Sequence, residues 1–162
     1  MGNRGAMLGG IGVVAALVGF FLFWTRGAHV ELKGKIQKIR THEIDTASSL
    51  AVVDFRFVNP ADYPFVVRSV DVYVEGADGK SAEGMIVSEV DAKRIFEGIP
   101  ELGPKYNETL KIRDKIGPKQ SEDKMISARF EMTEAAIEAR RRIWVRVEEV
   151  DGGVSEIGEE RR

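Results

Sequence analysis

The stretch DFRFVNPADYPFVVRSVDVYV, residues 54–74, decides the fold. Apolar and polar residues alternate on both sides of a short connection with two prolines, which is typical of two half-buried β-strands. A proline lacks the backbone donor of a strand ladder and pushes the residue before it toward extended geometry. Asn59-Pro60 and Tyr63-Pro64 therefore predict a stop and a corner, with Asn59 bonded to nearby backbone and Tyr63 covering the end of the core.

The alternation also assigns faces to the two flanking strands. Before the corner, the residues expected to face inward are Val53, Phe55 and Phe57. After it, one face is expected to carry Val66, Arg68, Val70, Val72 and Val74. The opposite, polar face is expected to carry Ser69, Asp71, Tyr73 and Glu75.

The rest of the chain adds further strands and two short helices. Alternation predicts strands over residues 30–40, 108–114, 126–132, 143–147 and 154–157. Residues 41–49 are predicted as a loop and residues 99–106 as irregular. Ser88 and Asp91 at capping-box spacing, with Gly98 as a stop, predict a helix over 89–97. The segment TEAAIEARRR, residues 133–142, is a good helix former and predicts one or two turns.

Several strands separated by turns within about 125 residues indicate a mainly β fold, an antiparallel β-sandwich with one or two short helices. Alternation on every clear strand predicts that each sheet has one solvated face and one buried face. We place this domain at residues 29–157 and a polar tail at residues 158–162.

Residues 1–28 are predicted to lie outside that domain. Residues 5–25 carry no charge, and a helix over about 6–24 matches the ~20 residues that cross a ~30 Å hydrocarbon layer. This single-span anchor contains Gly9, Gly12, Phe20, Phe21 and Trp24. A cleaved signal peptide is the alternative, but Thr25-Arg26-Gly27 is a poor cleavage site and the bulky end of the segment is typical of a membrane boundary.

The side of the membrane on which the domain lies is less directly encoded. A positive-inside count favours the cytoplasm, because basic residues follow the span. Most of them fall in a predicted strand, however, and folded domains translocate largely regardless of charge. We therefore expect the domain on the extracytoplasmic side.

Composition excludes several functions. The net charge is −2, from 24 basic and 26 acidic residues, which argues against nucleic acid as a partner. The chain has no cysteine and two histidines, so a disulfide framework, a thiolate zinc site and a cysteine nucleophile are excluded. His42, Glu43 and Asp45 could meet a metal but are more simply a solvated loop. We expect no enzyme, no cofactor, no metal site and no evident small-molecule substrate.

Aromatic residues on a polar face are the better functional candidates. Tyr73 and Trp144 both fall on the polar side of their strands, where they serve either as edge packing or as a partner contact. The insert from Ser88 to Tyr106 is the second candidate region, and its expected partner-binding residues are Ile95, Phe96 and Tyr106.

The connection VNPADYPF, residues 58–65, resembles that of the second subgroup of late embryogenesis abundant proteins, whose bacterial and archaeal members carry the water-stress and hypersensitive-response domain. The matching residues are Asn59, Pro60, Tyr63 and Pro64. The resemblance implies a seven-stranded immunoglobulin-like or fibronectin-like sandwich, often with an N-terminal membrane anchor, and it supplies no catalytic residue. The insert at 88–104 and the helix at 135–142 depart from a minimal sandwich.

Two functions follow as hypotheses. The first is a non-enzymatic, membrane-anchored binding or scaffolding module, such as an accessory subunit of a larger complex. Its partners would be the lipid bilayer and one or more membrane proteins. The alternative, implied by the resemblance, is a protein that protects the cell envelope against drying or osmotic stress.

Overall fold

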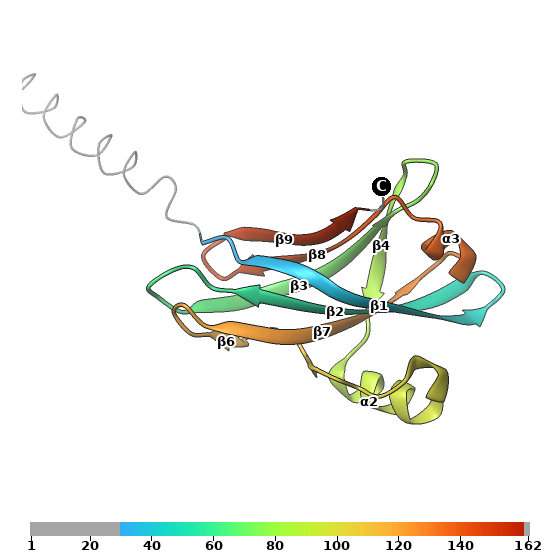
Figure 1. Ribbon diagram of the computed structural model, residues 1–162, viewed down its shortest axis with the longest axis horizontal. Coiled ribbons are helices and arrows are strands. Elements are labelled where there is room, and N and C mark those ends of the chain that lie inside the picture. The colour runs from blue at the N-terminus through green and yellow to red at the C-terminus, as the bar shows by residue number, and fades with distance from the viewer. Residues whose placement is uncertain (1–29, 161–162) are drawn as a thin grey trace, which may run out of the picture.

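The computed structural model describes residues 30–160, and the chain is mainly β, as predicted (Figure 1). The elements in chain order are β1 (Lys33–Asp45), β2 (Ser48–Val58), β3 (Phe65–Glu75), β4 (Ser81–Ile86), α2 (Glu89–Gly98), η1 (Pro100–Leu102), β5 (Glu108–Thr109), β6 (Lys115–Ile116), β7 (Ser121–Phe130), α3 (Glu134–Glu138), β8 (Arg142–Glu149) and β9 (Val154–Glu160).

The strands form one curled sheet in the order β1-β2-β7-β4-β3-β8-β9. All of these pairs are antiparallel, whereas the short β5 pairs with β7 in parallel and β6 joins β3. β4 leaves β3 after the pair Val72↔Gly84 and joins β7 at Met85↔Arg129, so it connects the two halves of the sheet. The two ends of the sheet also approach each other, because the Leu32 amide donates to Ser155 Oγ at 2.8 Å.

The main core lies between the two halves of this sheet. β2 and β7 contribute from one side, and β3, β8 and β9 from the other. The predicted inward residues Val53, Phe55 and Phe57 are all buried. Removing one such side chain from water contributes about 1.5–3 kcal/mol, so this row stabilises the fold strongly.

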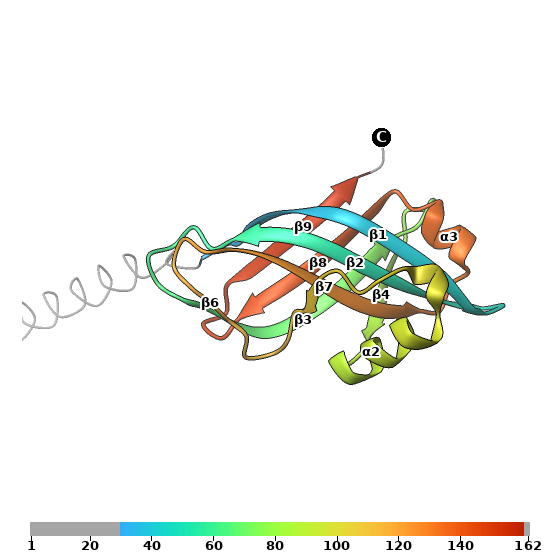
Figure 2. The ribbon, with the colours of Figure 1, turned by 60° about the horizontal axis from the view of Figure 1, so that its bottom comes forward.

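A second, smaller core overturns the prediction of one solvated face per sheet. The outer faces of β2 and β7 are covered by α2 and η1, and Figure 2 shows α2 outside β7. The cluster consists of Leu50, Val52, Ala92, Leu102 and Met125. β2 is consequently buried on both faces, which alternation alone cannot reveal because its cover comes from a segment more than thirty residues later.

The corner at 59–64 connects the two halves of the sheet, because β2 and β3 are not paired with each other. Asn59 is buried and bonds to backbone as predicted. Its Nδ2 donates to the carbonyls of Tyr63 at 2.8 Å and Gly117 at 3.1 Å, and its Oδ1 accepts from the Ala61 amide at 3.0 Å. The prediction for Tyr63 needs correction: its side chain is 44 % exposed, and the fully buried Phe65 fills the core at this end.

The predicted helix over 89–97 is confirmed as α2, with Ser88 Oγ accepting from the Asp91 amide. The predicted loop over 41–49 is wrong. β1 continues to Asp45 and only a tight turn precedes β2, since Asp45 accepts from the Ala47 amide and the Ser48 hydroxyl. The strand predicted over 108–114 is mostly wrong: only its first two residues form a strand, β5, and residues 110–114 form a turn that leads to β6. The structure also extends β9 to Glu160, into the predicted polar tail, where it pairs with Arg142.

The face assignment in the first half of β3 was wrong by one residue. A register shift lies between Val67 and Ser69 in the pairing with β8. Val67 is therefore buried, whereas Val66 is half-buried and Arg68 is exposed. After the register shift the predicted face assignment is correct, and Val70, Val72 and Val74 face the core.

The membrane anchor predicted over residues 6–24 lies outside the described residues, as do its members Gly9, Gly12, Phe20, Phe21 and Trp24. Among residues 30–160, neither length nor apolar character qualifies any helix to cross a bilayer.

Candidate functional site

The outer face of β3 and β8, called here the β3–β8 face, brings the two predicted aromatics together. Tyr73 and Trp144 are directly opposite in the strand register, with ring centroids 5.3 Å apart and planes inclined by 15°. Both side chains are half-buried. Cross-strand aromatic pairs of this kind stabilise a sheet by up to about 1 kcal/mol, so the stack is also part of the fold.

Two neighbours complete this stack. The Arg142 guanidinium lies 4.7 Å from the Trp144 ring centroid, and it also bonds to Glu156 at 3.3 Å. On β9, the residue opposite Trp144 is Gly158. A Cβ at Gly158 would lie 3.1 Å from Trp144 Cβ, so the glycine lets β9 lie close to β8 at this pair. The cation–π contact with Arg142 and the stack on Tyr73 both favour the observed orientation of the indole.

Charged residues flank the aromatic row. Two residues along on the same face, Asp71 lies opposite Arg146, and two residues further Ser69 lies opposite Glu148. Burial and the nearby carboxylate of Glu83 raise the pKa of Asp71, while Arg146 opposes that rise. Burial also raises the pKa of the Tyr73 phenol, so it stays a neutral hydrogen-bonding group at physiological pH.

The helices lie away from this face. α2 covers β2 and β7, and α3 contacts β1 and β2. Figure 1 shows α2 on the side of the molecule opposite β9. Within residues 30–160, the β3–β8 face thus has an aromatic centre, a charged margin and no helical cover.

The other three predicted partner-binding residues lie elsewhere. Ile95 and Phe96 are on α2 and pack, half-buried, against the second core. Tyr106 follows η1 and is 60 % exposed. The structure therefore brings Tyr73 and Trp144 together but places Ile95, Phe96 and Tyr106 on a different side.

A buried ion pair fixes the insert, and sequence reasoning missed it. Arg40 and Asp54 meet at 2.7 Å with side chains only 7 % and 3 % exposed. Arg40 also donates to the Leu102 and Pro104 carbonyls at 2.7 and 2.9 Å, and Asn107 donates to Asp54 at 2.9 Å. Asp54 falls at a position that alternation marks as solvated. Only the cover by the insert therefore reveals that it is buried and paired with Arg40.

The Arg40 guanidinium also connects two of the predicted residues. It lies 4.9 Å from the Phe96 ring centroid and 5.3 Å from that of Tyr106. Lys38 lies 5.3 Å from the same Tyr106 ring. These contacts make Phe96 and Tyr106 part of the fastening of the insert to the sheet.

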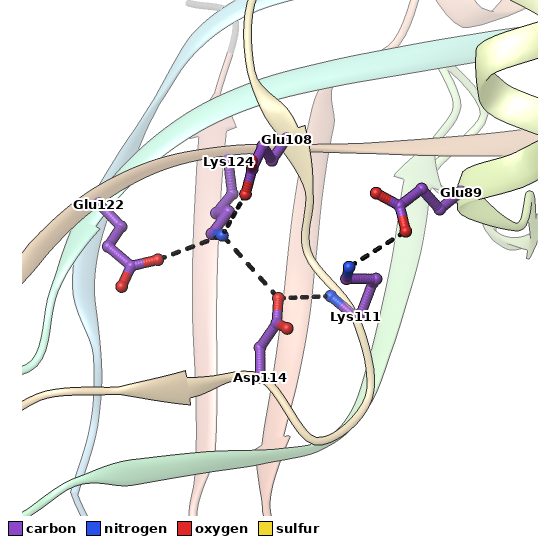
Figure 3. Close-up of polar contacts among 6 residues, drawn as sticks. All are labelled: Glu89, Glu108, Lys111, Asp114, Glu122 and Lys124. Carbon is purple, nitrogen blue, oxygen red and sulfur yellow. Dashed lines mark hydrogen bonds and ion pairs between the residues drawn. The ribbon is translucent and has the colours of Figure 1, made fainter.

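A second charged cluster surrounds Lys124 at the junction of β5, β6 and β7 (Figure 3). Its ammonium lies 3.4 Å from Glu122, 3.5 Å from Glu108 and 3.9 Å from Asp114. The Lys124 side chain is 14 % exposed, so a lysine held in place offsets part of the negative charge of these three carboxylates. Among the described residues, no group of three histidine, cysteine or acidic side chains is arranged to hold a metal ion.

Comparisons of the chain with protein-family models, curated proteins and solved structures found no match. The resemblance to late embryogenesis abundant proteins stays a prediction that rests on the connection at 58–65.

Proposed function

We propose that this protein is a non-enzymatic, membrane-anchored module that binds a protein partner through the β3–β8 face. The observation that carries the proposal is the stacked pair of Tyr73 and Trp144 at the centre of a sheet face that no described helix covers. Aromatic side chains surrounded by polar groups are the typical centre of a protein interface, because they bury a large area with little loss of rotamer freedom.

The charge pattern around the stack supports a protein partner. Asp71, Arg146 and Glu156 lie in one cross-strand row, which presents charges of both signs beside the aromatic pair. A mixed rim of this kind favours a partner with complementary charges and gives specificity more than affinity. It offers little to a phosphate backbone, which needs a consistent basic surface.

The finer architecture and the location belong to the same proposal. The two facing halves of the sheet support an immunoglobulin-like sandwich, although β4 connects the halves. An anchor at residues 6–24, ending a few residues before the described domain, would hold the β3–β8 face near a membrane partner. We assign the domain to the extracytoplasmic side, as an accessory subunit of a larger complex.

The test is quantitative co-purification of the full chain from gently solubilised native membranes. We expect Tyr73→Ala and Trp144→Ala to lose a partner that the wild type retains. Tyr106→Ala is the matched control, because it removes an exposed aromatic from a different side of the domain. Thermal unfolding of each variant reports whether the domain stays folded.

Retention of the same partner by folded Tyr73→Ala and Trp144→Ala would exclude this face. Loss in Tyr106→Ala alone would instead place the interface at the insert. Protection of the envelope stays the alternative prediction, and a deletion strain with unchanged survival of drying and osmotic shock would contradict it.

A further inference from the structure

A groove of about 500 Å³ opens between β3 and the segment that contains β5 and β6. It exists because β4 pairs with β3 only from Val72 onward and β6 pairs only with Phe65 and Val66. Within the described residues, no strand pairs with this edge of β3 between Arg68 and Asp71. The two halves of the sheet are therefore unsealed at this position.

The walls of the groove are mainly apolar. They are formed by Val70, Ile86, Val87, Leu110, Ile112 and Ile126. Val70, Leu110 and Ile126 belong to the main core, so the groove reaches from the surface to the space between the two halves. Ile112 at the rim is 66 % exposed. A concave apolar site of this volume is in the range that holds small organic molecules.

The charges of the groove are unbalanced. Glu89 and Lys111 line the groove and form an ion pair at 3.1 Å (Figure 3), so the only lining ammonium is already paired. Asp71 also lines the groove and forms no ion pair within the described part of the chain. Among the lining residues, two carboxylates against one ammonium leave one negative charge. Arg146 lies opposite Asp71 on β8 but does not line the groove, and it opposes the rise in the pKa of Asp71 without reversing it. The buried Thr109 hydroxyl, also in the lining, has no hydrogen-bond partner among residues 30–160.

We propose that this groove binds a small organic cation that has an apolar body and a single amine. The amine would lie beside Asp71, and the hydrocarbon part would cover Val70, Leu110 and Ile126. An anionic ligand of the same shape would meet Asp71 and Glu89 with like charge, and a neutral ligand would leave the Asp71 carboxylate without a counter-ion inside the groove. This site shares Asp71 with the charged margin of the β3–β8 face but does not include the aromatic pair, and it does not depend on a protein partner.

The sequence gives no sign of this site, because its walls come from four separate segments. Residues 69–71, 86–89, 109–112 and 126 meet only after β4 crosses from one half of the sheet to the other. Alternation marks Val70 and Ile126 as ordinary core residues, and nothing local distinguishes them from Val72 or Ala128.

The test uses three probes with one body and different head groups: cyclohexylammonium, cyclohexanol and cyclohexanecarboxylate. The full chain, reconstituted with zwitterionic lipid, carries isotope-labelled isoleucine methyl groups. We expect cyclohexylammonium to shift the methyl signals of Ile86, Ile112 and Ile126 and to leave those of Ile39 and Ile157 unchanged. Cyclohexanol should bind about tenfold more weakly, which corresponds to about 1.4 kcal/mol. Cyclohexanecarboxylate should not bind.

The Asp71→Asn variant should lower the affinity for cyclohexylammonium to that for cyclohexanol while the same methyl signals respond. Asp78→Asn, on the β3–β4 turn, is the matched control and should bind as the wild type does. Equal binding of the carboxylate or the alcohol would overturn the assignment of a cation. Equal shifts at all five isoleucines, or an unchanged affinity in Asp71→Asn, would overturn the site itself.

Discussion

Removal of the Asp54 carboxylate is the sharpest test of how the insert is held. In Asp54→Ala, the Arg40 guanidinium loses its 2.7 Å ion pair in a site where both side chains are less than a tenth exposed. Loss of one partner of a buried ion pair destabilises a fold by about 3–5 kcal/mol. Arg40 keeps the carbonyls of Leu102 and Pro104, so we expect the lower end, about 3 kcal/mol.

The measurement is thermal unfolding of the full chain followed by circular dichroism. For a domain of this size, about 3 kcal/mol corresponds to a fall in Tm of roughly 10 °C. Hydrogen exchange adds a local readout, since amides of residues 88–107 should exchange faster than those of β8. The double variant Arg40→Met with Asp54→Leu should recover only part of the loss. Apolar side chains remove the unpaired buried charge, but the carbonyls of Leu102 and Pro104 lose their donor.

Asp123→Ala is the matched control. Asp123 also pairs with an arginine, Arg56, at 2.6 Å, but both side chains are more than a third exposed. Exposed pairs contribute little to stability, so this variant should keep nearly the wild-type Tm. If Asp54→Ala lowers the Tm no more than Asp123→Ala does, the buried pair does not hold the insert.

Three further variants test the fold and one of its ionisable groups. Gly84→Ala should lower the free energy of unfolding by about 1–3 kcal/mol in denaturant unfolding, because its Cβ would lie 2.6 Å from Phe130 Cζ. Wild-type stability of this variant would show that β4 can shift to make room. Asn59→Ala should lose at least about 2 kcal/mol by the same measurement, since the buried backbone groups of the corner lose their partner; a smaller loss would mean that water replaces the amide. Burial raises the pKa of Asp71, so ionisation of this carboxyl opposes folding as the pH rises through and above its ordinary value. The Tm of Asp71→Asn minus that of the wild type should therefore increase from about pH 3 to pH 7. A difference in Tm that stays constant over this range would contradict the raised pKa of Asp71.

The sequence predicted those features that depend only on residues close together in the chain. The capping of α2 by Ser88 depends on residues three apart, and the buried row on β2 depends on a period of two. The cross-strand stack was partly accessible in the same way, because Tyr73 and Trp144 both fall on the polar side of their strands. Their pairing was not accessible, since it needs the register between β3 and β8.

Features that depend on distant segments could not be predicted. The β3 register shift depends on how β8 pairs with it, and the burial of Asp54 depends on a cover formed by α2 and η1. The groove has the same origin, because it results from β4 changing partners at Gly84. In each case the pattern of polar and apolar residues along one strand is plain from the sequence. What surrounds those side chains is not, because it depends on segments far away in the chain.

The two ends of the curled sheet bear on aggregation. β1 is a terminal strand, and it carries exposed lysines at positions 33, 35 and 38 together with two register shifts. Lysines and bulges on an outer strand make it a poor template for a strand from another chain. The other terminal strand, β9, has its beginning occupied by the bond from Leu32 to Ser155. Many copies could therefore lie close together on one surface without joining edge to edge into a continuous sheet.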